Sequence, residues 1–492
     1  MQNREFFLNK CVKIARLGKG NVSPNPMVGS VIVCKGEVIG EGYHEKYGSH
    51  HAEVNAINSV KDKFLLSKST LYVNLEPCSH FGKTPPCSDF IIKHKIPKVV
   101  IGCMDTYSEV DGTGIEKMKN AGIDVKIGIM EKESRDLNKR FFTFHEKKRP
   151  YIILKWAENK DGFIAPENQT EPFWMTSSKS KILVHKWRSE EDSILVGRIT
   201  AEKDNPYLTV REVQGENPIR IVIDKDLKLS TDLNLFDSDA KTIIFNTLKT
   251  QEISNNYFIK INFNNLIKNI LQELHKQNIQ SIIIEGGSNT LQSFIDVKLW
   301  DEARIFTANK ELVEGLKAPI ITGKTMEETE VRGDKLTYYK FLSSSEKMWE
   351  EFTSKNQIYK KKGIPESFFF CDNKKDADEC SELVLKGIKQ ATACSLWSYK
   401  KHNRSLPKKG DLFIVTNWNG KAKAIAETTN TQQVSFNQIT PEFARTEGEG
   451  DKSLTYWKKV HWDFFSREMR KHGKKPSENM IIVCEYFKII WS

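Results

Sequence analysis

One histidine, two cysteines and a glutamate between residues 51 and 87 could together bind a metal ion and move a proton. The chain reads His51-Ala52-Glu53, then Pro77-Cys78, then Pro86-Cys87. Zinc accepts neutral imidazole and thiolate ligands, and three protein ligands leave its fourth position open to water. Bound zinc lowers the pKa of that water toward about 7, which makes hydroxide available at neutral pH. We expect Glu53, two residues from His51, to shuttle protons without binding the metal.

The same pattern predicts a reaction, the hydrolytic loss of ammonia from an amino-substituted heterocycle. A histidine, a nearby glutamate and two cysteines form the zinc site of nucleobase deaminases. A lone histidine or cysteine is more often structural, but here three motifs would have to be structural at once. Three other cysteines have no such motif around them and are interpreted as packing residues: Cys11, Cys34 and Cys103.

The spacing of the cysteines bears on the substrate. Deaminases usually have two residues between them, whereas eight separate Cys78 from Cys87, among them His80 and Lys83. The compact cation of Lys83 suits a phosphate group. The insertion therefore predicts a phosphorylated substrate, with a solvated loop as the alternative for His80 and Lys83.

The elements that must position these residues alternate between strands and helices, which predicts an α/β fold. In residues 1–145 we expect a first helix near 6–15, then strands and one helix that opens at His51. This alternation is typical of a three-layer α/β/α sandwich. The strands are expected at residues 30–34, 38–43, 71–75, 98–102 and 125–129.

Residues 146–344 repeat this rhythm with short apolar runs that suit a mostly parallel sheet covered on both faces. The run Ile282–Glu285 is followed by Gly286 and Gly287, and helix amides after such a turn can hold a phosphate. An ordinary strand-to-helix turn is the alternative. The G-x-G-x-x-G motif is absent, so an ordinary Rossmann site is not expected. The runs are residues 151–155, 193–197, 219–224, 242–245 and 281–285.

Residues 345–492, after the polar run 343–347, differ in amino-acid composition from the two segments before them. A helix over 377–385 leads to Lys389 and Thr392, and strands are expected at 410–415, 422–427 and 483–489. A later helix carries Trp457, Trp462 and Phe465. These aromatic residues either form a core or stack on single-stranded nucleic acid.

The bulk properties place this chemistry in a soluble protein of about three domains. The net charge of +11 suits anionic partners such as phosphorylated metabolites or RNA, or simply a basic surface. We find no signal peptide and no apolar stretch of about 18 residues, which predicts a reducing, cytoplasmic location and no membrane partner. A homo-oligomer is also expected.

Four motifs of the first segment resemble the bifunctional riboflavin-biosynthesis deaminase/reductase family: residues 23–29, 42–44, 51–53 and 76–87. The resemblance implies a cytidine-deaminase-like sandwich with zinc on His51, Cys78 and Cys87 and with Glu53 as the proton shuttle. It implies deamination of a diaminohydroxyphosphoribosylaminopyrimidine to the aminouracil. The residues it places around the pyrimidine and its ribose phosphate are Asn25, His44, His80 and Lys83.

The second segment is similar to the reductase half of that family, for example at residues 161–162, 174–177, 204–206 and 208–211. The resemblance implies a dihydrofolate-reductase-like α/β domain in which NADPH reduces the ribosyl group to ribityl. The implied NADPH contacts are Thr200 and Asp204, with Gly286 and Gly287 in the phosphate-binding turn. The implied substrate contacts are Lys155, Trp174, Arg188, Leu208, Arg211 and Glu285.

One residue departs from the family pattern. Pro172 stands where the family has a substrate-contacting serine, and proline offers neither a hydroxyl nor an amide hydrogen. The loss of one hydrogen bond costs about 0.5–1.5 kcal/mol. We therefore expect that the change weakens the reductase without abolishing its activity, unless a shifted loop restores the contact.

The third segment resembles an ASCH domain, a small PUA-like β-barrel. The resemblance implies RNA or a modified nucleoside as its partner, with Lys389 and Thr392 as candidate site residues. Two alternatives to a bifunctional enzyme of riboflavin synthesis stay open. One is a base deaminase directed to RNA by the third segment, and the other is an RNA-binding protein with vestigial enzyme domains.

Overall fold

The computed structural model describes residues 2–79, 85–106, 112–167, 173–312, 314–360, 362–402 and 404–492. The chain divides into two compact units, Met1–Phe341 and Leu342–Ser492. The boundaries at 145 and 344 stay predictions, because the first unit contains both expected enzyme segments. Among the described residues, no helix has the length and apolar character needed to cross a bilayer.

The first sheet has the strand order β2-β1-β3-β4-β5. β1 pairs antiparallel with β2 and β3, while β3, β4 and β5 run parallel. β1 is buried along its whole length, as expected for a strand covered on both faces. The bounds are β1 (Gly29–Cys34), β2 (Glu37–Tyr43), β3 (Thr70–Leu75), β4 (Lys98–Cys103) and β5 (Asp124–Ile127).

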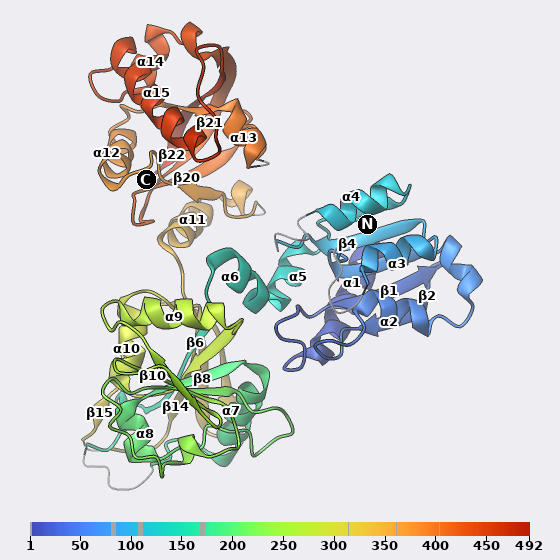
Figure 1. The fold of residues 1–492 in the computed structure, drawn as a ribbon, viewed down its shortest axis with the longest axis vertical. Coiled ribbons are helices and arrows are strands. Elements are labelled where there is room, and N and C mark those ends of the chain that lie inside the picture. Colours follow the sequence, from blue (N-terminus) through green and yellow to red (C-terminus); the bar gives the residue numbers. More distant parts are fainter. Residues whose placement is uncertain are drawn as a thin grey trace. The chain divides into compact units, whose positions relative to one another are not determined.

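Helices cover both faces of this sheet, which confirms the three-layer sandwich (Figure 1). One face carries α1 (Gln2–Ala15) and α5 (Glu131–Leu137). The other face carries α2 (Ala52–Ser59), α3 (Cys87–Lys93) and α4 (Thr113–Asn120), whose apolar residues share one core with the strands. After α5, α6 (Lys139–Lys147) leads into the second sheet.

The second sheet is mixed, with the order β11-β12-β10-β9-β8-β13-β6-β14-β17-β16. Its central strands run parallel, and antiparallel strands extend both edges. The parallel strands are β12 (Asn256–Lys260), β10 (Thr242–Asn246), β9 (Ile219–Ile223), β8 (Ser193–Gly197), β13 (Ser281–Ile284), β6 (Tyr151–Asn159) and β14 (Glu302–Ala308). The edge strands are β11 (Gln251–Ile253), β17 (Asp334–Lys340) and β16 (Lys324–Val331).

Two helices cover each face of the central part of this sheet. α7 (Ser178–Glu190) and α8 (Arg198–Asp204) pack on one side, and α9 (Leu266–Lys276) and α10 (Ser288–Asp296) on the other. A short ladder joins β7 (Phe163–Ala165) to β15 (Leu316–Lys317). The α/β class expected for this segment is confirmed.

The unit Leu342–Ser492 contains a sheet with the order β18-β20-β21-β22-β19, in which β18 and β19 are the edges. The expected small β-barrel therefore takes the form of a half-barrel. Its strands are β18 (Glu366–Phe368), β20 (Leu412–Thr416), β21 (Ala422–Ser435), β22 (Ile481–Trp491) and β19 (Ala391–Ser395). Its helices are α11 (Ser344–Lys355), α12 (Lys374–Leu385), α13 (Leu396–Lys401), α14 (Pro441–Glu447) and α15 (Leu454–Arg470).

The aromatic residues of α15 belong to the core of this unit. Trp457 is 3% exposed and Phe465 is fully buried, and both pack with Phe436 and Phe443. Trp462 is partly buried against the same cluster. Because buried rings cannot stack on a nucleic acid, the core interpretation holds for Trp457 and Phe465.

Candidate functional site

The predicted metal ligands meet where two helices begin and one strand ends. His51 is the residue that caps α2, Cys87 opens α3, and Cys78 follows β3. Cys78 Sγ lies 3.5 Å and Cys87 Sγ 3.3 Å from His51 Nδ1. Zinc bond lengths place sulfur and nitrogen ligands about 3.5 Å apart in a tetrahedral site. These three side chains therefore have the spacing that zinc requires.

The electrostatics of the cysteines favour one thiolate. The hydrogen bond with Cys87 and the nearby His51 lower the pKa of the Cys78 thiol to about 4. The backbone amide of Cys87 also donates to Cys78 Sγ at 3.3 Å. The thiolate is the form of cysteine that binds metal, so Cys78 is prepared for a cation.

Glu53 stands beside these ligands on the first turn of α2 and is only 3% exposed. Burial, together with the charge of Cys78, raises the pKa of the Glu53 carboxyl to about 7. A carboxyl group with such a pKa can both hold and release a proton at neutral pH. Glu53, His51 and Cys78 line a common pocket of about 340 Å³.

Asn25 and His44 line the same pocket and are hydrogen-bonded to each other. His44 Nδ1 lies 3.1 Å from the carbonyl oxygen of His50, which can only accept, so Nδ1 donates. His44 Nε2 then accepts from the Asn25 amide at 3.1 Å. Burial lowers the pKa of His44, which favours this neutral ring. The other two predicted contacts, His80 and Lys83, lie outside the described residues.

Sequence reasoning missed several residues that complete this pocket. Glu76 is 4% exposed and accepts the backbone amides of Asp105, Gly112 and Ile115 at 3.2–3.3 Å. Its place directly before Pro77-Cys78 was a signal that could have found it. The pocket is also lined by Phe141, Phe144 and His145 of α6 and by Asn278 and Gln280 before β13.

Gln280 had no signal in the sequence. Its side-chain amide donates to the carbonyl oxygen of Pro24 at 2.6 Å, and its backbone amide donates to Asp192 at 2.7 Å. A residue directly before β13 of the second sheet therefore holds the Pro24-Asn25 loop, which precedes the first sheet. Because 256 positions separate the two partners, only the tertiary structure reveals the contact.

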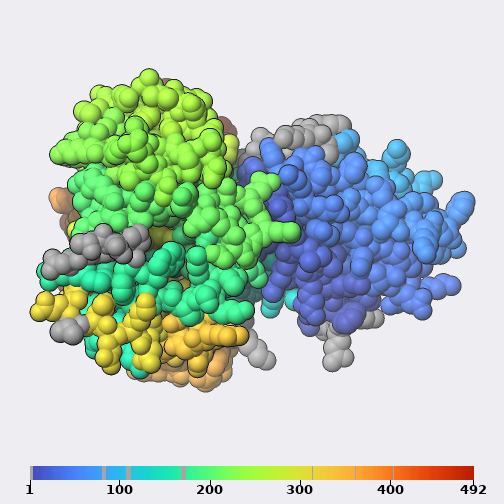
Figure 2. Space-filling view, turned by 90° about the horizontal axis from the view of Figure 1, so that it is seen from below, coloured from blue at the N-terminus to red at the C-terminus, as the bar shows by residue number. Residues whose placement is uncertain are grey.

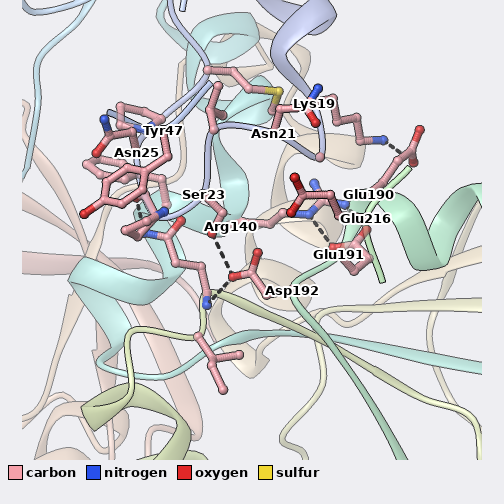
Figure 3. A pocket seen from close by; sticks show the side chains of 18 of the residues that line it. Lys19, Asn21, Ser23, Asn25, Tyr47, Arg140, Glu190, Glu191, Asp192 and Glu216 are labelled. Carbon is pink, nitrogen blue, oxygen red and sulfur yellow. Dashed lines mark hydrogen bonds and ion pairs between the residues drawn. The ribbon is translucent and has the colours of Figure 1, made fainter. Parts of the chain in front are cut away.

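A second pocket of about 580 Å³ adjoins the first and shares Asn25 and Gln280 with it. Figure 3 shows its charged side chains lying in pairs, Lys19 with Glu190 and Arg140 with Glu191. Lys46 and Glu216 line the same pocket, with the ammonium 3.2 Å from the carboxylate. In Figure 2 the blue surface of the N-terminal segment adjoins a green part of the surface. The cations in this pocket are thus already neutralised by acids.

The predicted reductase substrate residues include a buried charge cluster. Arg188 Nη2 lies 2.8 Å from Glu285 Oε2, and Lys155 Nζ lies 3.8 Å from Glu285 Oε1. Burial alone would raise the pKa of Glu285, but the two cations hold it below its ordinary value. Arg188 Nε and Glu285 Oε1 are buried without a hydrogen-bond partner. Such atoms usually find a partner, so they suit a polar ligand.

Thr200 and the two predicted glycines form a cradle at the start of α10. Gly287 is the residue that caps this helix, and no side chain caps it. A Cβ at Gly286 would lie 2.6 Å from Val196 Cα, and one at Gly287 would lie 3.2 Å from Thr200 Oγ1. Open amides at a helix N-terminus bind phosphate, so these residues fit a dinucleotide such as NADPH. Asp204 ends the neighbouring α8.

The remaining predicted reductase residues are more dispersed. Leu208 is 2% exposed with a φ of 55°, and Arg211 Nη1 donates to Thr209 at 3.1 Å. Trp174 is 57% exposed, with the Lys181 ammonium over its ring. Pro172 lies outside the described residues, so its predicted effect stays a prediction.

In the unit Leu342–Ser492, Lys389 is buried and not part of a solvated face. Its ammonium lies 2.6 Å from Glu449 and 3.2 Å from Glu447. The indole of Trp457 donates to the other oxygen of Glu447. Thr392 is half-buried on β19. The roles predicted for Lys389 and Thr392 stay predictions.

Three family descriptions match successive parts of the chain. The cytidine and deoxycytidylate deaminase zinc-binding region matches residues 1–103, the RibD C-terminal domain residues 150–341, and the ASCH domain residues 366–491.

Individual proteins agree with this division. The riboflavin biosynthesis protein RibD of Aquifex aeolicus is 39% identical over 331 residues, which is 66% of this chain and 92% of that protein. RibD of Escherichia coli K12 is 34% identical over 329 residues, 63% of this chain and 88% of that protein. The crystal structure of a diaminohydroxyphosphoribosylaminopyrimidine deaminase/5-amino-6-(5-phosphoribosylamino)uracil reductase from Thermotoga maritima superposes with a TM-score of 0.64 at 34% identity. It covers 69% of this chain and 99% of its own.

Proposed function

The chain belongs to the RibD family of bifunctional deaminase/reductases of riboflavin biosynthesis, and we propose how its own residues carry out the two reactions. The first is the zinc-dependent deamination of diaminohydroxyphosphoribosylaminopyrimidine. The second is the NADPH-dependent reduction of the ribosyl side chain of the product to ribityl.

For the deamination, the buried Glu53 beside three zinc ligands is the observation that carries the proposal. Zinc supplies the Lewis acidity that makes water nucleophilic when it is held by His51, Cys78 and Cys87. Glu53 accepts a proton from the attacking water and returns it to the departing amino group. The pKa of about 7 lets one carboxyl group do both. Asn25 orients the pyrimidine and is itself held by the neutral His44.

For the reduction, Arg188, Lys155 and Glu285 bind the polar groups of the pyrimidine product. NADPH supplies the hydride when it is bound, with a phosphate at the turn Gly286-Gly287 and Thr200 beside it. The protein's contribution is orientation, because the buried cations fix Glu285 in its charged form. We assign Asp204 to the cofactor and Trp174, Leu208 and Arg211 to the substrate.

For the ASCH domain we propose a small modified nucleoside as the partner, with Lys389 and Thr392 at the site. The burial of Trp457 and Phe465 supports a small ligand over a long RNA, because these rings are not available for stacking. A homo-oligomeric state and a cytoplasmic location remain predictions.

The test of the main proposal follows both products with the purified full-length chain. The phosphorylated diaminopyrimidine should release ammonia when zinc is bound, and NADPH should then be consumed by the deaminated product. No ammonia from the zinc-loaded protein would contradict the first assignment. Ammonia without NADPH consumption would contradict the second.

RNA-directed deamination is the alternative to this proposal. Gln280 and Asn278 line the same pocket as Asn25, and its volume of about 340 Å³ suits a mononucleotide. Deamination of an RNA oligonucleotide that is lost on removal of residues 346–492 would favour the alternative instead.

A further inference from the structure

A second group of metal-binding side chains lies in the unit Leu342–Ser492. It consists of Cys371, Cys380 on α12 and Glu449, which follows α14. Cys371 Sγ lies 3.7 Å from Cys380 Sγ, and Cys380 Sγ lies 3.3 Å from Glu449 Oε1. Nine positions separate Cys371 from Cys380 and 69 separate Cys380 from Glu449, and neither cysteine belongs to a C-x-x-C motif.

The distances are those of a tetrahedral zinc site. Zinc bond lengths to thiolate and carboxylate predict about 3.8 Å between two sulfurs and about 3.5 Å between sulfur and oxygen. The observed 3.7 Å and 3.3 Å agree with both. The same agreement holds for His51 with Cys78 and Cys87, at 3.5 Å and 3.3 Å. If Cys371 and Cys380 were only packed against each other, no carboxylate would be needed at ligand distance from Cys380. Glu449 lies at that distance.

The backbone and the burial also fit a built site. Cys371 has a φ of 65°, which is uncommon for a residue other than glycine and persists only where the surroundings hold it. Cys380 is 3% exposed, whereas Cys371 and Glu449 are half-buried, so an ion could enter from their side.

The surrounding charges leave room for a dication. Lys389 contacts both Glu449 and Glu447, so two carboxylates share one ammonium. With the cysteines as thiolates, the two sulfurs, Glu447 and Glu449 would carry four negative charges against at most two positive charges, those of Lys389 and of His461, which lies 3.5 Å from Glu447. A divalent cation reduces this excess, and the remaining contact between Lys389 and Glu447 keeps the ammonium paired.

We propose that Cys371, Cys380 and Glu449 form a second metal site that takes a thiolate-preferring divalent cation, with Zn²⁺ as the expected ion. Two sulfur ligands select zinc over magnesium or calcium, which prefer oxygen. Three protein ligands leave one coordination position for water or a small ligand. Because Glu449 also binds Lys389, that ligand would meet the candidate site of the ASCH domain.

Zinc stoichiometry of the full-length chain tests this proposal. The reduced protein is stripped with a chelator, reloaded with Zn²⁺ alone, desalted, and its metal measured by mass spectrometry. We expect about two zinc ions per wild-type chain, and about one in Cys371→Ser and in Glu449→Gln. Cys394→Ser is the matched control, a half-buried cysteine of the same unit outside the cluster, and should keep two.

A second measurement does not depend on changing the proposed ligands. Cys78→Ser disables the first site, and the chain should still bind about one Co²⁺ with the near-ultraviolet charge-transfer band of thiolate ligation. No such band, or one zinc in the wild type that Cys371→Ser leaves unchanged, would overturn the proposal. A loss of two hydrogens in intact mass, without zinc binding, would show a disulfide between Cys371 and Cys380 and overturn it as well.

Discussion

Glu53 shows how position changes the chemistry of a single residue. An exposed glutamate has a pKa of about 4.3, whereas burial raises the pKa of Glu53 to about 7. The same burial keeps the carboxyl within the pocket that holds His51 and Cys78. A carboxyl group with this pKa can exchange a proton near neutral pH, which is the property that the proposed role of Glu53 requires.

Glu53→Gln removes the titratable group while it keeps size and polarity. We expect zinc content to stay at the wild-type level and ammonia release to fall by about 10²–10⁴-fold, the usual contribution of general acid–base catalysis. Ammonia release and metal analysis on the same sample are the measurements. Glu37→Gln, an exposed residue of β2, is the control and should behave as wild type. Wild-type turnover in Glu53→Gln would remove Glu53 from its role.

Gly286 is required because its α-hydrogen faces the backbone of Val196. In Gly286→Ala the new methyl would lie 2.6 Å from Val196 Cα, and such overpacking costs about 1–3 kcal/mol. We expect a lower melting temperature and weaker NADPH binding, measured by fluorescence titration. Gly363→Ala is the control, since its Cβ would contact nothing. Unchanged NADPH affinity in Gly286→Ala would argue against a cofactor at this turn.

Glu447 predicts how the stability of its unit depends on pH. Burial alone would raise the pKa of Glu447, but Lys389 and His461 lower it to about 2. The unfolded value is about 4.3, so this contribution to the free energy of unfolding is present above about pH 4.3 and is lost as the pH falls toward 2. The melting temperature of this unit, measured by thermal unfolding, should therefore fall as the pH is lowered from about 4.3 toward 2.

The matched variants separate Glu447 from general acid effects. Glu447→Gln should unfold at lower temperature at neutral pH and change less between pH 5 and pH 2.5 than wild type. Glu478→Gln, an exposed residue, should follow the wild-type curve. Equal slopes in all three proteins would contradict the assignment.

At the scale of elements, the polar run 343–347 illustrates a local signal with two meanings. Its polar composition predicts a segment that precedes the third domain, yet it begins α11 with a capping box between Ser343 and Glu346. The pattern S-x-x-E is a known helix start. Composition alone does not distinguish a polar linker from a polar first turn, because both are rich in serine and glutamate.

Ser343→Ala should destabilise α11, because the Glu346 amide loses its acceptor at 3.1 Å. Loss of a serine N-cap costs about 1 kcal/mol. Urea unfolding of the full chain, followed by circular dichroism, should show an earlier transition for the second unit. Ser354→Ala, an exposed position of the same helix, should shift the midpoint much less. An equal shift for both variants would exclude the cap as the cause.

Strand length is a second feature of the elements that the sequence predicts only in part. Residues 422–427 alternate as expected, but β21 continues to Ser435 and pairs with β22 across register shifts. The stretch 428–433 is polar, so no apolar pattern marks it as a strand. Residues 428–433 form a strand because they pair with the long strand β22, which supplies the hydrogen bonds.

At the scale of the whole molecule, residues near the first sheet and residues directly before β13 of the second sheet share the wall of the deaminase pocket. Gln280, which is 4% exposed, ties the second sheet to Pro24 next to Asn25. The neighbouring pocket has its cations paired with acids, so it offers little attraction to a phosphorylated intermediate. The hydrogen bond from Gln280 to Pro24 is thus one contact through which the second half of the unit supports the deaminase pocket.

Gln280→Ala should weaken the deaminase and spare the reductase. The loss of one hydrogen bond costs about 0.5–1.5 kcal/mol, roughly 2- to 10-fold in kcat/KM for ammonia release. NADPH oxidation with the deaminated pyrimidine supplied directly should stay within twofold of wild type, about the scatter of such measurements. Gln277→Ala, which lines only the second pocket, is the control. Equal losses in both reactions would point to general destabilisation.

The expected chemistry of this protein follows from its sequence by itself, because the candidate zinc ligands and the glutamate proposed to move protons lie in short motifs with recognisable residue types. His51, Glu53, Cys78 and Cys87, the turn Gly286-Gly287 and the alternation of strands and helices are all local signals. The tertiary structure alone decided what depends on residues far apart in the chain. It brought Gln280 to Pro24, buried Lys389 between Glu447 and Glu449, and placed Cys380 beside Glu449. Such contacts join single residues without a motif, so only packing reveals them.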